Sequence, residues 1–511
     1  MTAQHVVGID VGTEGSRAAV FTLDGTPLAF ASTAHELEFP RPGWAQQHPH
    51  EWWRSATSAA RGAIENSGVP ASDIAAISVS GTGTTVVASD RQGRPLRSSL
   101  MWMDVRAAKQ AAKIAATGDE VLRLSGGTAS AEWFFSKTLW LAEHEPDIYR
   151  EAEVLSECVD WLGHRLTGVW AANLSLAAVR AYYRHSEGGW PVGLLEKLGH
   201  SEVLEKLPGQ VLGVGEVLGV LRADAAEDLG LLAGIPVAVS AADAEVGVIG
   251  LNALAPGKTA LITGSSHLLL GQSANPIYGP GMFGSYEGGV LPGHYLVEGG
   301  QASTGSITRW LKNLVNGSYF SHPLDDDDVY GRLMTDAASL PIGADGVRVL
   351  DFWQGNRTPY VDPKARGMIW GLSLAHGPAH LFRGVLEGVA FGTENILRTF
   401  GANGYHPTEL VVAGGATRNP LWLQIHADVS QIPLVIPQVT DVVALGNGIL
   451  AATAAGHFPN ISTAAQAMSR SAKRVEPDPA RGEAYQPLFD RYRRSFEAMR
   501  DLMHEEAAAV D

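Results

Sequence analysis

The sequence is poor in cysteine and in clustered positive charge, and each shortage excludes a class of protein. The chain has 511 residues and one cysteine, Cys158, so it cannot form an internal disulfide. A single thiol is typical of a reducing compartment, and we expect a cytoplasmic protein. The formal net charge is −16 at pH 7, and no run of lysine and arginine offsets it. This balance argues against a nucleic-acid partner and against an anionic membrane surface.

Long apolar segments are also absent. The two longest, residues 236–250 and 442–456, are interrupted by Asp243 and Asn447 and are too short to cross a bilayer. With 45% hydrophobic and 18% charged residues, the composition is that of an ordinary globular protein, so we expect no membrane association. The chain is too long for one compact core, which predicts two domains.

The first 34 residues contain three apolar runs that we expect to form adjacent strands. The first run ends at Asp10, a glycine-rich loop follows, and a DG turn at residues 24–25 leads into the third run at 27–34. A helix over 51–66 and a strand over 74–79 would complete the unit. The pattern predicts a β-β-β-α-β order.

The loop after Asp10 carries chemistry suited to an anion. Gly12 lets backbone N–H groups approach a ligand, Thr13 adds a hydroxyl, and Arg17 offers a guanidinium to a phosphate. Asp10 stands where a strand ends and has the oxygen ligands that Mg²⁺ prefers. The loop lacks the Lys-Ser/Thr pair of a P-loop, and a strand follows it where a dinucleotide fold has a helix. A plain glycine-rich hairpin turn is the alternative interpretation.

Two further polar segments follow predicted strands in this half. The loop SGTGTT at residues 80–85 follows the strand at 74–79, at the edge where open α/β sheets bind ligands. Trp102 and Asp104 lie at the end of an apolar run over 100–103. Asp104 has a second interpretation, as the cap of a helix that begins near residue 106.

Asp243 is the third acid to follow a buried strand. The strand is predicted at 235–240, and a run of small residues follows the acid. Ionised carboxylates are rarely buried without a partner or a role. We consider two interpretations, a catalytic base and a cap for the helix that follows.

The order of elements starts again after residue 257. A strand at 258–262, a loop TGSS, a strand at 267–270, a strand at 295–298 and a helix from 303 to 311 repeat the first unit. The repeat predicts an α/β protein with two similar domains, 1–251 and 252–511, that face a cleft. Further expected elements are a strand at 350–353, a helix at 377–400, a strand at 409–412, a helix at 441–456 and helices in the last fifty residues.

Seven segments in order resemble the FGGY family of carbohydrate kinases. They are IDVGTEGSRAAVF, SECVDWLGHRLTG, AADAEVGVIG, ITGSSHLLL, EGGQASTG, GNRTPYVDPKARG and AGGATRNPLWLQIHADVSQIPL, and the similarity runs from residue 6 to about 456. The resemblance implies two domains of the ribonuclease-H-like, actin-like ATPase fold. It also implies transfer of the γ-phosphoryl group of ATP, with Mg²⁺, to a hydroxyl of a pentulose, a related sugar, a gluconate or a polyol.

The resemblance implies a role for each matching residue. Asp243 is implied as the catalytic base, and Asp10 and Asp243 as Mg²⁺ contacts. ATP contacts implied by the motifs are Asp10, Gly12, Thr13, Arg17, Thr263, Gly264, Ser265, Ser306, Trp310, Gly414, Gly415 and Asn419. Implied sugar contacts are Thr82, Gly83, Thr84, Trp102, Asp104 and Asp243.

The motifs depart from individual branches of the family, and the departures bear on the substrate. The loop SGTGTT lacks the Gln-Met-His run of xylulokinases and the Arg-Glu pair of glycerol kinase, whereas EGGQASTG and the GGW at 188–190 look more like ribulokinase. We expect a ketopentose, D-ribulose, L-ribulose or a xylulose. The alternatives are a polyol kinase and, from another class, an actin-like or chaperone-type ATPase without a sugar. A homodimer is compatible with the sequence.

Overall fold

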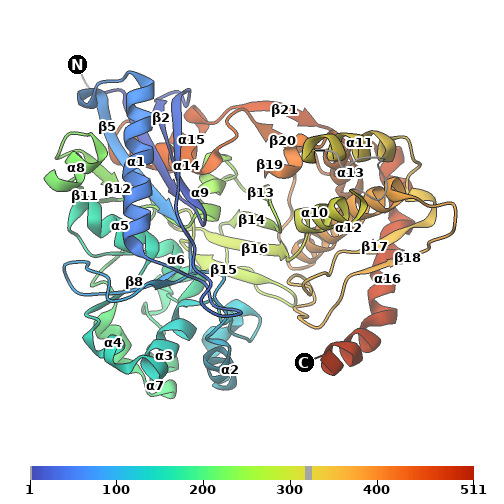
Figure 1. The fold of residues 1–511 in the computed structure, drawn as a ribbon, viewed down its shortest axis with the longest axis horizontal. Helices are drawn as coiled ribbons and strands as arrows, with labels where there is room; N and C mark the ends of the chain where they lie inside the picture. Colours follow the sequence, from blue (N-terminus) through green and yellow to red (C-terminus); the bar gives the residue numbers. More distant parts are fainter. Residues whose placement is uncertain (1–2, 317–324, 511) are drawn as a thin grey trace.

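The computed structural model describes residues 3–316 and 325–510, and it contains two large β-sheets in two lobes (Figure 1). The first sheet has six strands. In spatial order they are β11 (Val217–Val220), β12 (Pro236–Ala238), β5 (Ile74–Gly81), β1 (His5–Val11), β2 (Gly15–Thr22) and β3 (Pro27–Ala34). β1 pairs with β2 in antiparallel and with β5 in parallel register, as the sequence predicts for a hairpin followed by a crossover helix.

The second sheet has seven strands and repeats the arrangement of the first. In spatial order they are β15 (Phe283–Glu287), β16 (Tyr295–Gln301), β14 (His267–Ser273), β13 (Lys258–Thr263), β19 (Glu409–Gly414), β20 (Leu434–Pro437) and β21 (Ser471–Val475). Here β13 pairs with β14 in antiparallel and with β19 in parallel register. The α/β fold with a repeated unit is confirmed. The two domain ranges, 1–251 and 252–511, stay a prediction.

Helices cover both sheets. In the first half they are α1 (Pro49–Ser67), α2 (Ala108–Ala116), α3 (Phe134–His144), α4 (Pro146–Glu151), α5 (Cys158–Thr167), α6 (Leu174–Arg180), α7 (Val192–Leu198), α8 (Ala223–Leu229) and α9 (Asp243–Gly250). In the second half they are α10 (Gly305–Val315), α11 (Asp326–Ala338), α12 (Pro378–Ala402), α13 (Pro420–Ser430), α14 (Val442–Ala454), α15 (Ile461–Met468) and α16 (Pro479–Val510). Within the described residues, no helix has both the length and the apolar character needed to span a bilayer.

Smaller sheets complete the fold. One has four strands, β4 (Gln46–Gln47), β7 (Ser99–Leu100), β6 (Val86–Ser89) and β8 (Val154–Glu157), and two others pair β9 (Ala172–Asn173) with β10 (Val211–Leu212) and β17 (Arg348–Leu350) with β18 (Met368–Trp370).

Helix α14 belongs to the second half of the sequence but packs on the first sheet. Figure 1 shows helix α14, with α15 next to it, beside the blue strand β2, and α14 also contacts β1 and β5. A Cβ added at Gly8 would lie 2.0 Å from the Ala444 carbonyl oxygen, and one at Gly250 would lie 1.8 Å from that of Val442. Glycine is therefore required at both positions, because the backbone of α14 packs directly against the backbone of β1 and of α9. The two halves of the sequence are interlocked here.

Asn447 explains the polar residue that interrupts the last apolar segment. Its side-chain amide donates to the Ile9 carbonyl and to Ser80 Oγ, both at 2.8 Å. Its Oδ1 accepts from Ser78 Oγ at 3.0 Å and from Ser240 Oγ at 2.7 Å. The fully buried amide thus joins α14 to the ends of three strands of the first sheet.

Several predicted boundaries were wrong. The run at 100–103 forms only the short strand β7, because the chain turns at residues 102–103 toward α2, which begins at 108 and not near 106. The strand expected at 350–353 is β17, which ends at residue 350. Strand β15 was missed, and β21 lies where we expected helices. Four of the five residues of β21 are exposed, so its sequence has little of the apolar pattern that identifies a strand.

Candidate active site

The carboxyl end of the first sheet brings three carboxylates and one guanidinium together. Asp10 is buried at the end of β1 and accepts a hydrogen bond from Ser80 Oγ at 3.2 Å. Burial, together with the negative charges of Asp243 and Asp441, raises the pKa of Asp10 to about 7, and Arg17 acts in the opposite direction. Nη1 of Arg17 lies 3.9 Å from Oδ2 of Asp441. The structure thus brings Asp10, Arg17 and Asp243 close enough to influence one another's charge.

Asp441 is a member of this cluster that sequence reasoning missed. It precedes α14, and its Oδ1 accepts the backbone N–H of Ala444 at 3.1 Å as a helix cap. The cap explains the residue locally, so the sequence holds no signal for a second role. Its position beside Arg17 depends on the packing of α14 against the first sheet.

Asp243 is the first residue of α9. Its Oδ1 accepts the N–H of Ala244 at 2.8 Å, and the N-cap position belongs to Ala242. Burial raises the pKa of Asp243, whereas the Ala244 N–H and the positive charge of Arg17 lower it. A carboxylate with a raised pKa is a better proton acceptor than an ordinary aspartate, which suits a general base.

The site fits a Mg²⁺ ion that is bound together with phosphates. In the described ranges, no group of three or more His, Cys, Asp or Glu residues could hold a metal ion by itself. Mg²⁺ is commonly held by one or two carboxylates, with water and phosphate oxygens as its other ligands. Burial is the main cause that raises the pKa values of Asp10 and Asp243, and the negative charges of Asp243 and Asp441 add to it at Asp10. A cation at Asp10 would stabilise the ionised carboxylate.

Three side chains from other parts of the first half hold the loop between β1 and β2 in place. Nε2 of His35 lies 3.0 Å from the Gly12 carbonyl oxygen and 3.2 Å from that of Thr13. Gln47 Nε2 donates to the Thr13 carbonyl at 3.3 Å. The indole N–H of Trp102 donates to Thr13 Oγ1 at 3.0 Å. The predicted phosphate loop and the predicted sugar contact Trp102 are therefore in direct contact.

The loop between β13 and β14 is exposed at its tip. Thr263 is buried, and its Oγ1 donates to the Ala413 carbonyl at 2.6 Å and accepts the Ala416 N–H at 3.1 Å. Gly264 and Ser265 follow, both exposed. The Ser265 carbonyl accepts a hydrogen bond from Oγ of Ser306 at 2.9 Å. These bonds fix the loop, and the Gly264 N–H adds a further bond within it by donating to the Ser266 carbonyl at 2.9 Å.

The turn after β19 meets this loop edge to edge. Gly414 has φ of 92°, and a Cβ there would lie 1.8 Å from the Thr263 carbonyl oxygen. A Cβ at Gly415 would meet nothing within 4 Å. Asn419 caps α13 by accepting the Trp422 N–H at 3.0 Å. Gly414 is therefore needed for the fold, whereas Gly415 borders open space.

A cavity of about 710 Å³ lies between these two loops and helix α10. Its lining includes the predicted residues Gly264, Ser265, Gly415 and Asn419, together with Thr308, Arg309, Lys312, Tyr330, Phe382 and Trp422.

Ser306 and Trp310, expected to form its wall, are not among the lining residues. Positions 305, 308, 309 and 312 share one face of α10, and 306 and 310 lie to the side of it, because a helix turns by about 100° per residue. Trp310 packs edge-on to Trp353.

The loop 81–84 lies next to the start of α9. Gly81 forms a parallel β-bridge with Ala242, and a Cβ added at Gly83 would lie 3.0 Å from the Ala242 Cβ. Thr82 is buried, and its Oγ1 is 2.9 Å from Oγ1 of Thr85. The structure therefore brings the predicted sugar loop and Asp243 side by side.

A buried lysine and a buried glutamate hold this loop from below. Lys137 Nζ donates to the carbonyls of Thr84 and Met101, at 2.7 and 2.6 Å. Thr84 has φ of 54°, and the N–H of Thr85 donates to Glu157 Oε2 at 2.8 Å. Burial lowers the pKa of Lys137 and raises that of Glu157. Lys137 joins the loop to the chain that carries Trp102.

Asp104 does not reach the cleft. Its carboxylate accepts the Ala45 N–H at 2.7 Å and forms an ion pair with Arg106, 2.7 Å from Nη2, and both side chains are almost completely buried. The structure does not place Asp104 where it could contact a sugar directly. The alternative, a cap for the helix expected near residue 106, is not met either, because the N-cap of α2 is Ala107; Asp104 Oδ1 instead accepts the Arg106 N–H at 3.0 Å in the turn before α2.

Arg180 and Glu298 are further buried polar residues that the sequence analysis missed. Arg180, at the end of α6, forms two bonds of 2.9 and 3.0 Å to the carboxylate of Glu298 on β16. Burial, with Glu298 and Asp243 nearby, raises the pKa of Glu245 to about 7, while Arg180 lowers it. The pair joins the two halves of the sequence near Asp243. The only signal in the sequence was a charge at the end of an apolar run.

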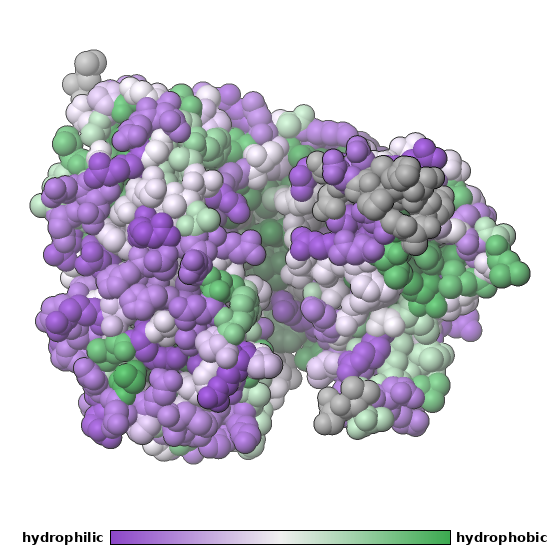
Figure 2. All heavy atoms as spheres, in the orientation of Figure 1, coloured by the Kyte–Doolittle hydropathy of each residue, from purple (hydrophilic) through white to green (hydrophobic). Residues whose placement is uncertain are grey.

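Figure 2 shows a deep hollow between the lobe built on the first sheet and the lobe built on the second. The cluster of carboxylates around Asp10 lies on the first sheet, and the cavity beside α10 lies in the other lobe. The arrangement offers one carboxylate-lined site and one nucleotide-sized cavity in a single molecule.

Comparison with known proteins agrees with this arrangement. Residues 5–250 match the model of the N-terminal domain, and residues 259–455 that of the C-terminal domain, of the FGGY family of carbohydrate kinases. A ribulokinase of Geobacillus thermodenitrificans is 31% identical, with 96% of this chain and 94% of that protein covered.

Solved structures give the same result. The xylulose kinase of Rhodospirillum rubrum has a TM-score of 0.87 at 27% identity, covering 98% of this chain and 100% of that one. A glycerol kinase of Plasmodium falciparum, with a TM-score of 0.83 at 19% identity over 96% of this chain and 97% of that one, shares the fold.

Proposed function

Because the chain belongs to the FGGY family of carbohydrate kinases, we propose that it transfers the γ-phosphoryl group of ATP to a hydroxyl of a ketopentose. Relatives named ribulokinase match the chain over nearly its whole length, and a structural neighbour is named a xylulose kinase. Ribulose and xylulose are therefore the proposed substrates. Membership in this family sets aside the actin-like or chaperone-type ATPase without a sugar substrate.

The observation that carries the proposal is the position of Asp243. It begins α9 beside the loop 81–84 and shares the acidic cluster with Asp10. We propose that Asp243 accepts the proton of the attacking hydroxyl as the oxygen bonds to the γ-phosphorus and ADP leaves. Phosphoryl transfer passes through a loose transition state, so the protein mainly positions the reactants and one proton acceptor is sufficient.

The phosphates would be held by the two hairpin loops. The N–H of Ser265 beside the exposed Gly264, and the backbone and hydroxyl of Thr13, are suited to phosphate oxygens. Gly415 and Asn419, with Arg309 of α10, line the cavity proposed for the nucleoside. A Mg²⁺ ion held by Asp10 would neutralise charge on the β- and γ-phosphates when bound. Closure of the lobes would exclude water and limit idle ATP hydrolysis.

The sugar would bind on the first lobe. Thr82, Gly83 and Thr84 belong to the loop beside the start of α9, and Trp102 contacts Thr13 of the first hairpin; we keep all four as proposed contacts. Asp104 is removed from that set, because its carboxylate is buried against Arg106. The lone thiol supports a cytoplasmic location.

The proposal is tested by sugar-dependent release of ADP. The purified chain is incubated with MgATP and, in turn, D-ribulose, L-ribulose, D-xylulose, L-xylulose, fructose, ribitol, erythritol and glycerol. We expect one pentulose to raise ADP release at least about tenfold above the sugar-free rate. A chelator added in excess over Mg²⁺ is the matched control and should abolish the increase. A response confined to a polyol would replace the pentulose by a polyol substrate, and no response to any sugar would overturn the proposal.

A further inference from the structure

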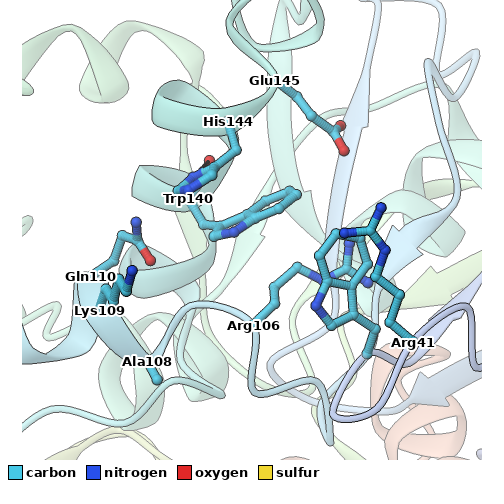
Figure 3. Close-up of a pocket in the computed structure, with 9 residues that line it drawn as sticks. Arg41, Arg106, Ala108, Lys109, Gln110, Trp140, His144 and Glu145 are labelled. Atoms are coloured by element: carbon cyan, nitrogen blue, oxygen red, sulfur yellow. Dashed lines mark hydrogen bonds between the residues drawn. The ribbon is translucent and has the colours of Figure 1, made fainter.

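A second cavity, of about 480 Å³, lies on the first lobe and is lined by none of the residues of the proposed active site (Figure 3). It lies between the loop that carries Arg41, the start of α2 and the end of α3. Its lining residues are Arg41, Trp44, Arg106, Ala108, Lys109, Gln110, Trp140, His144 and Glu145. We call this cavity the basic pocket.

Positive charge dominates the basic pocket, in a chain whose net charge is −16. Within the described residues, neither Arg41 nor Lys109 has a carboxylate within the 4.0 Å of an ion pair. Figure 3 shows them approaching the cavity from different segments, with Arg106 between them. Glu145 is the one acid of the lining, and its carboxylate is already paired with Arg97 at 3.0 Å.

Arg106 lines the basic pocket and is paired with Asp104, and Arg97 is paired with the lining residue Glu145, but one nitrogen of each guanidinium group has no acceptor in the part of the chain that the structure describes. The Arg106 side chain is 1% exposed, and its Cζ lies 3.7 Å from the centroid of the Trp44 ring. Nη1 of Arg106 and Nη1 of Arg97 are both buried without a hydrogen-bond partner among the described residues. Burial and the charge of Arg106 lower the pKa of Arg97. Buried donors without acceptors are uncommon and need an explanation.

The start of α2 adds to the positive character of this wall. The helix begins at Ala108, and the N-cap residue Ala107 has no side chain that could cap it. The Ala108 N–H donates to the Val105 carbonyl at 3.2 Å, and the dipole of the helix start favours negative charge beside Lys109 and Gln110. An anion here would meet the ammonium group, the guanidinium groups and the helix start together.

We propose that the basic pocket binds a small organic phosphate, such as a sugar phosphate, at a site separate from the active site. A phosphate monoester carries negative charge that could pair with Arg41 and Lys109, and Arg and Lys are the usual residues that bind it. The volume, within the range of small-ligand sites, is larger than a bare phosphate needs. Trp44 and Trp140 provide apolar surface for the rest of the molecule.

Calorimetry with three probes tests the proposal. The full chain is titrated with glucose 6-phosphate, inorganic phosphate and glucose, none of which is a pentulose or a pentulose phosphate. We expect glucose 6-phosphate to bind more tightly than inorganic phosphate, with an affinity that falls as salt is added, and glucose not to bind. Equal binding of glucose, or no binding of glucose 6-phosphate, would overturn the proposal.

Variants separate the basic pocket from the active site. Arg41→Ala/Lys109→Ala should weaken glucose 6-phosphate at least about tenfold, the effect of one lost charged hydrogen bond. Lys113→Ala is the matched control, because Lys113 lies on α2 but pairs with Glu143 outside the pocket. Its affinity should equal that of wild type. Wild-type affinity in the double variant would place the ligand elsewhere and overturn the proposal.

A third variant is expected to strengthen binding, a result that loss of the folded structure cannot produce. Glu145→Gln removes the one acid of the lining and should tighten glucose 6-phosphate binding, so the expected change has the opposite sign. Thermal unfolding confirms that each variant is folded before titration. Weaker binding in Glu145→Gln, in a folded protein, would contradict an anion site.

Discussion

The hairpins β1–β2 and β13–β14 have the same place in their sheets but different chemistry at their tips. In each hairpin the first strand pairs in parallel with a strand from later in the same half of the sequence, β1 with β5 and β13 with β19. The first hairpin has the buried acid Asp10 where β1 ends, with Arg17 opposite it in register. The second has Thr263, whose hydroxyl is occupied by backbone groups.

This difference indicates a division of work between two copies of one unit. The first copy concentrates carboxylates, which suits a metal ion and a proton acceptor. The second copy presents glycine, serine and backbone N–H groups beside a cavity of about 710 Å³, which suits phosphates and a nucleoside. Identical topology does not give identical function, because function depends on the residues at the loop tips.

The largest expected loss of activity comes from Asp243, and it distinguishes a catalytic base from a mere charge at the start of α9. Asp243→Asn keeps the shape and a polar contact but cannot accept a proton, so kcat should fall by roughly 10²- to 10⁴-fold. The KM for sugar should change much less, because the lost interaction belongs to the transition state. Asp224→Asn, at an exposed carboxylate on α8, is the control. If Asp243 were only a helix-end charge, turnover would stay near wild type.

A smaller loss of activity is expected at the tip of the first hairpin. Asp10→Asn removes a proposed metal contact and should lower kcat about 10²-fold, with sugar binding by calorimetry nearly unchanged. Thr263→Val, the matched change in the second hairpin, should leave the response to Mg²⁺ concentration as in wild type. Equal sensitivity of both variants to Mg²⁺ would remove the distinction between the hairpins.

The same Asp10→Asn variant should gain stability in the absence of ligands. Burial raises the pKa of Asp10 from 3.8, the ordinary value expected in the unfolded chain, to about 7 in the folded chain. Between about pH 4 and 7 the folded chain therefore binds more protons than the unfolded chain, and its stability falls as pH rises. At pH 8 the substitution should raise the free energy of unfolding by roughly 2 to 4 kcal/mol. Urea unfolding at pH 8 and pH 4 measures this. A gain at pH 4 equal to that at pH 8 would contradict the cause.

An intermediate effect is expected at the tip of the second hairpin. Gly264→Val should raise the KM for ATP about tenfold, because a side chain would stand where backbone meets phosphate. A Cβ at Gly264 meets only the Ser266 carbonyl oxygen, at 3.8 Å, so the fold has room for it. Gly193→Val, at another open glycine, is the control. Loss of sugar binding as well as ATP use would count against a nucleotide role.

The smallest effect concerns the bond that joins the first hairpin to the sugar side. Trp102→Phe removes the indole N–H that donates to Thr13 Oγ1 at 3.0 Å. One neutral hydrogen bond contributes about 1 kcal/mol, so kcat/KM should fall roughly fivefold. Steady-state kinetics with the best sugar measures the change. An unchanged kcat/KM would show that the bond does not position the loop.

Sequence reasoning predicted the two hairpins because apolar runs, glycine loops and a repeated order are local patterns. It placed Asp10 and Asp243 at or just past the ends of strands, and Gly264 in a hairpin loop, for the same reason. Asp441 escaped it, because a helix cap explains that residue completely until α14 is packed on the first sheet. Asp104 was assigned to the sugar because its buried partner Arg106 and the N–H of Ala45 cannot be read from spacing.

The other misses have the same origin. Ser306 and Trp310 were placed on the correct helix but on the side of it that does not line the cavity. The pair of Arg180 and Glu298 joins segments 118 residues apart, and only tertiary structure reveals such a contact.

A crystal structure with ADP, Mg²⁺ and the best pentulose tests the central claim most directly. We predict a sugar hydroxyl within about 3.2 Å of the Asp243 carboxylate, the limit for proton transfer through a hydrogen bond. The β-phosphate should lie against the backbone of Gly264 and Ser265. A sugar bound away from Asp243, or a nucleotide that contacts neither hairpin, would contradict the account.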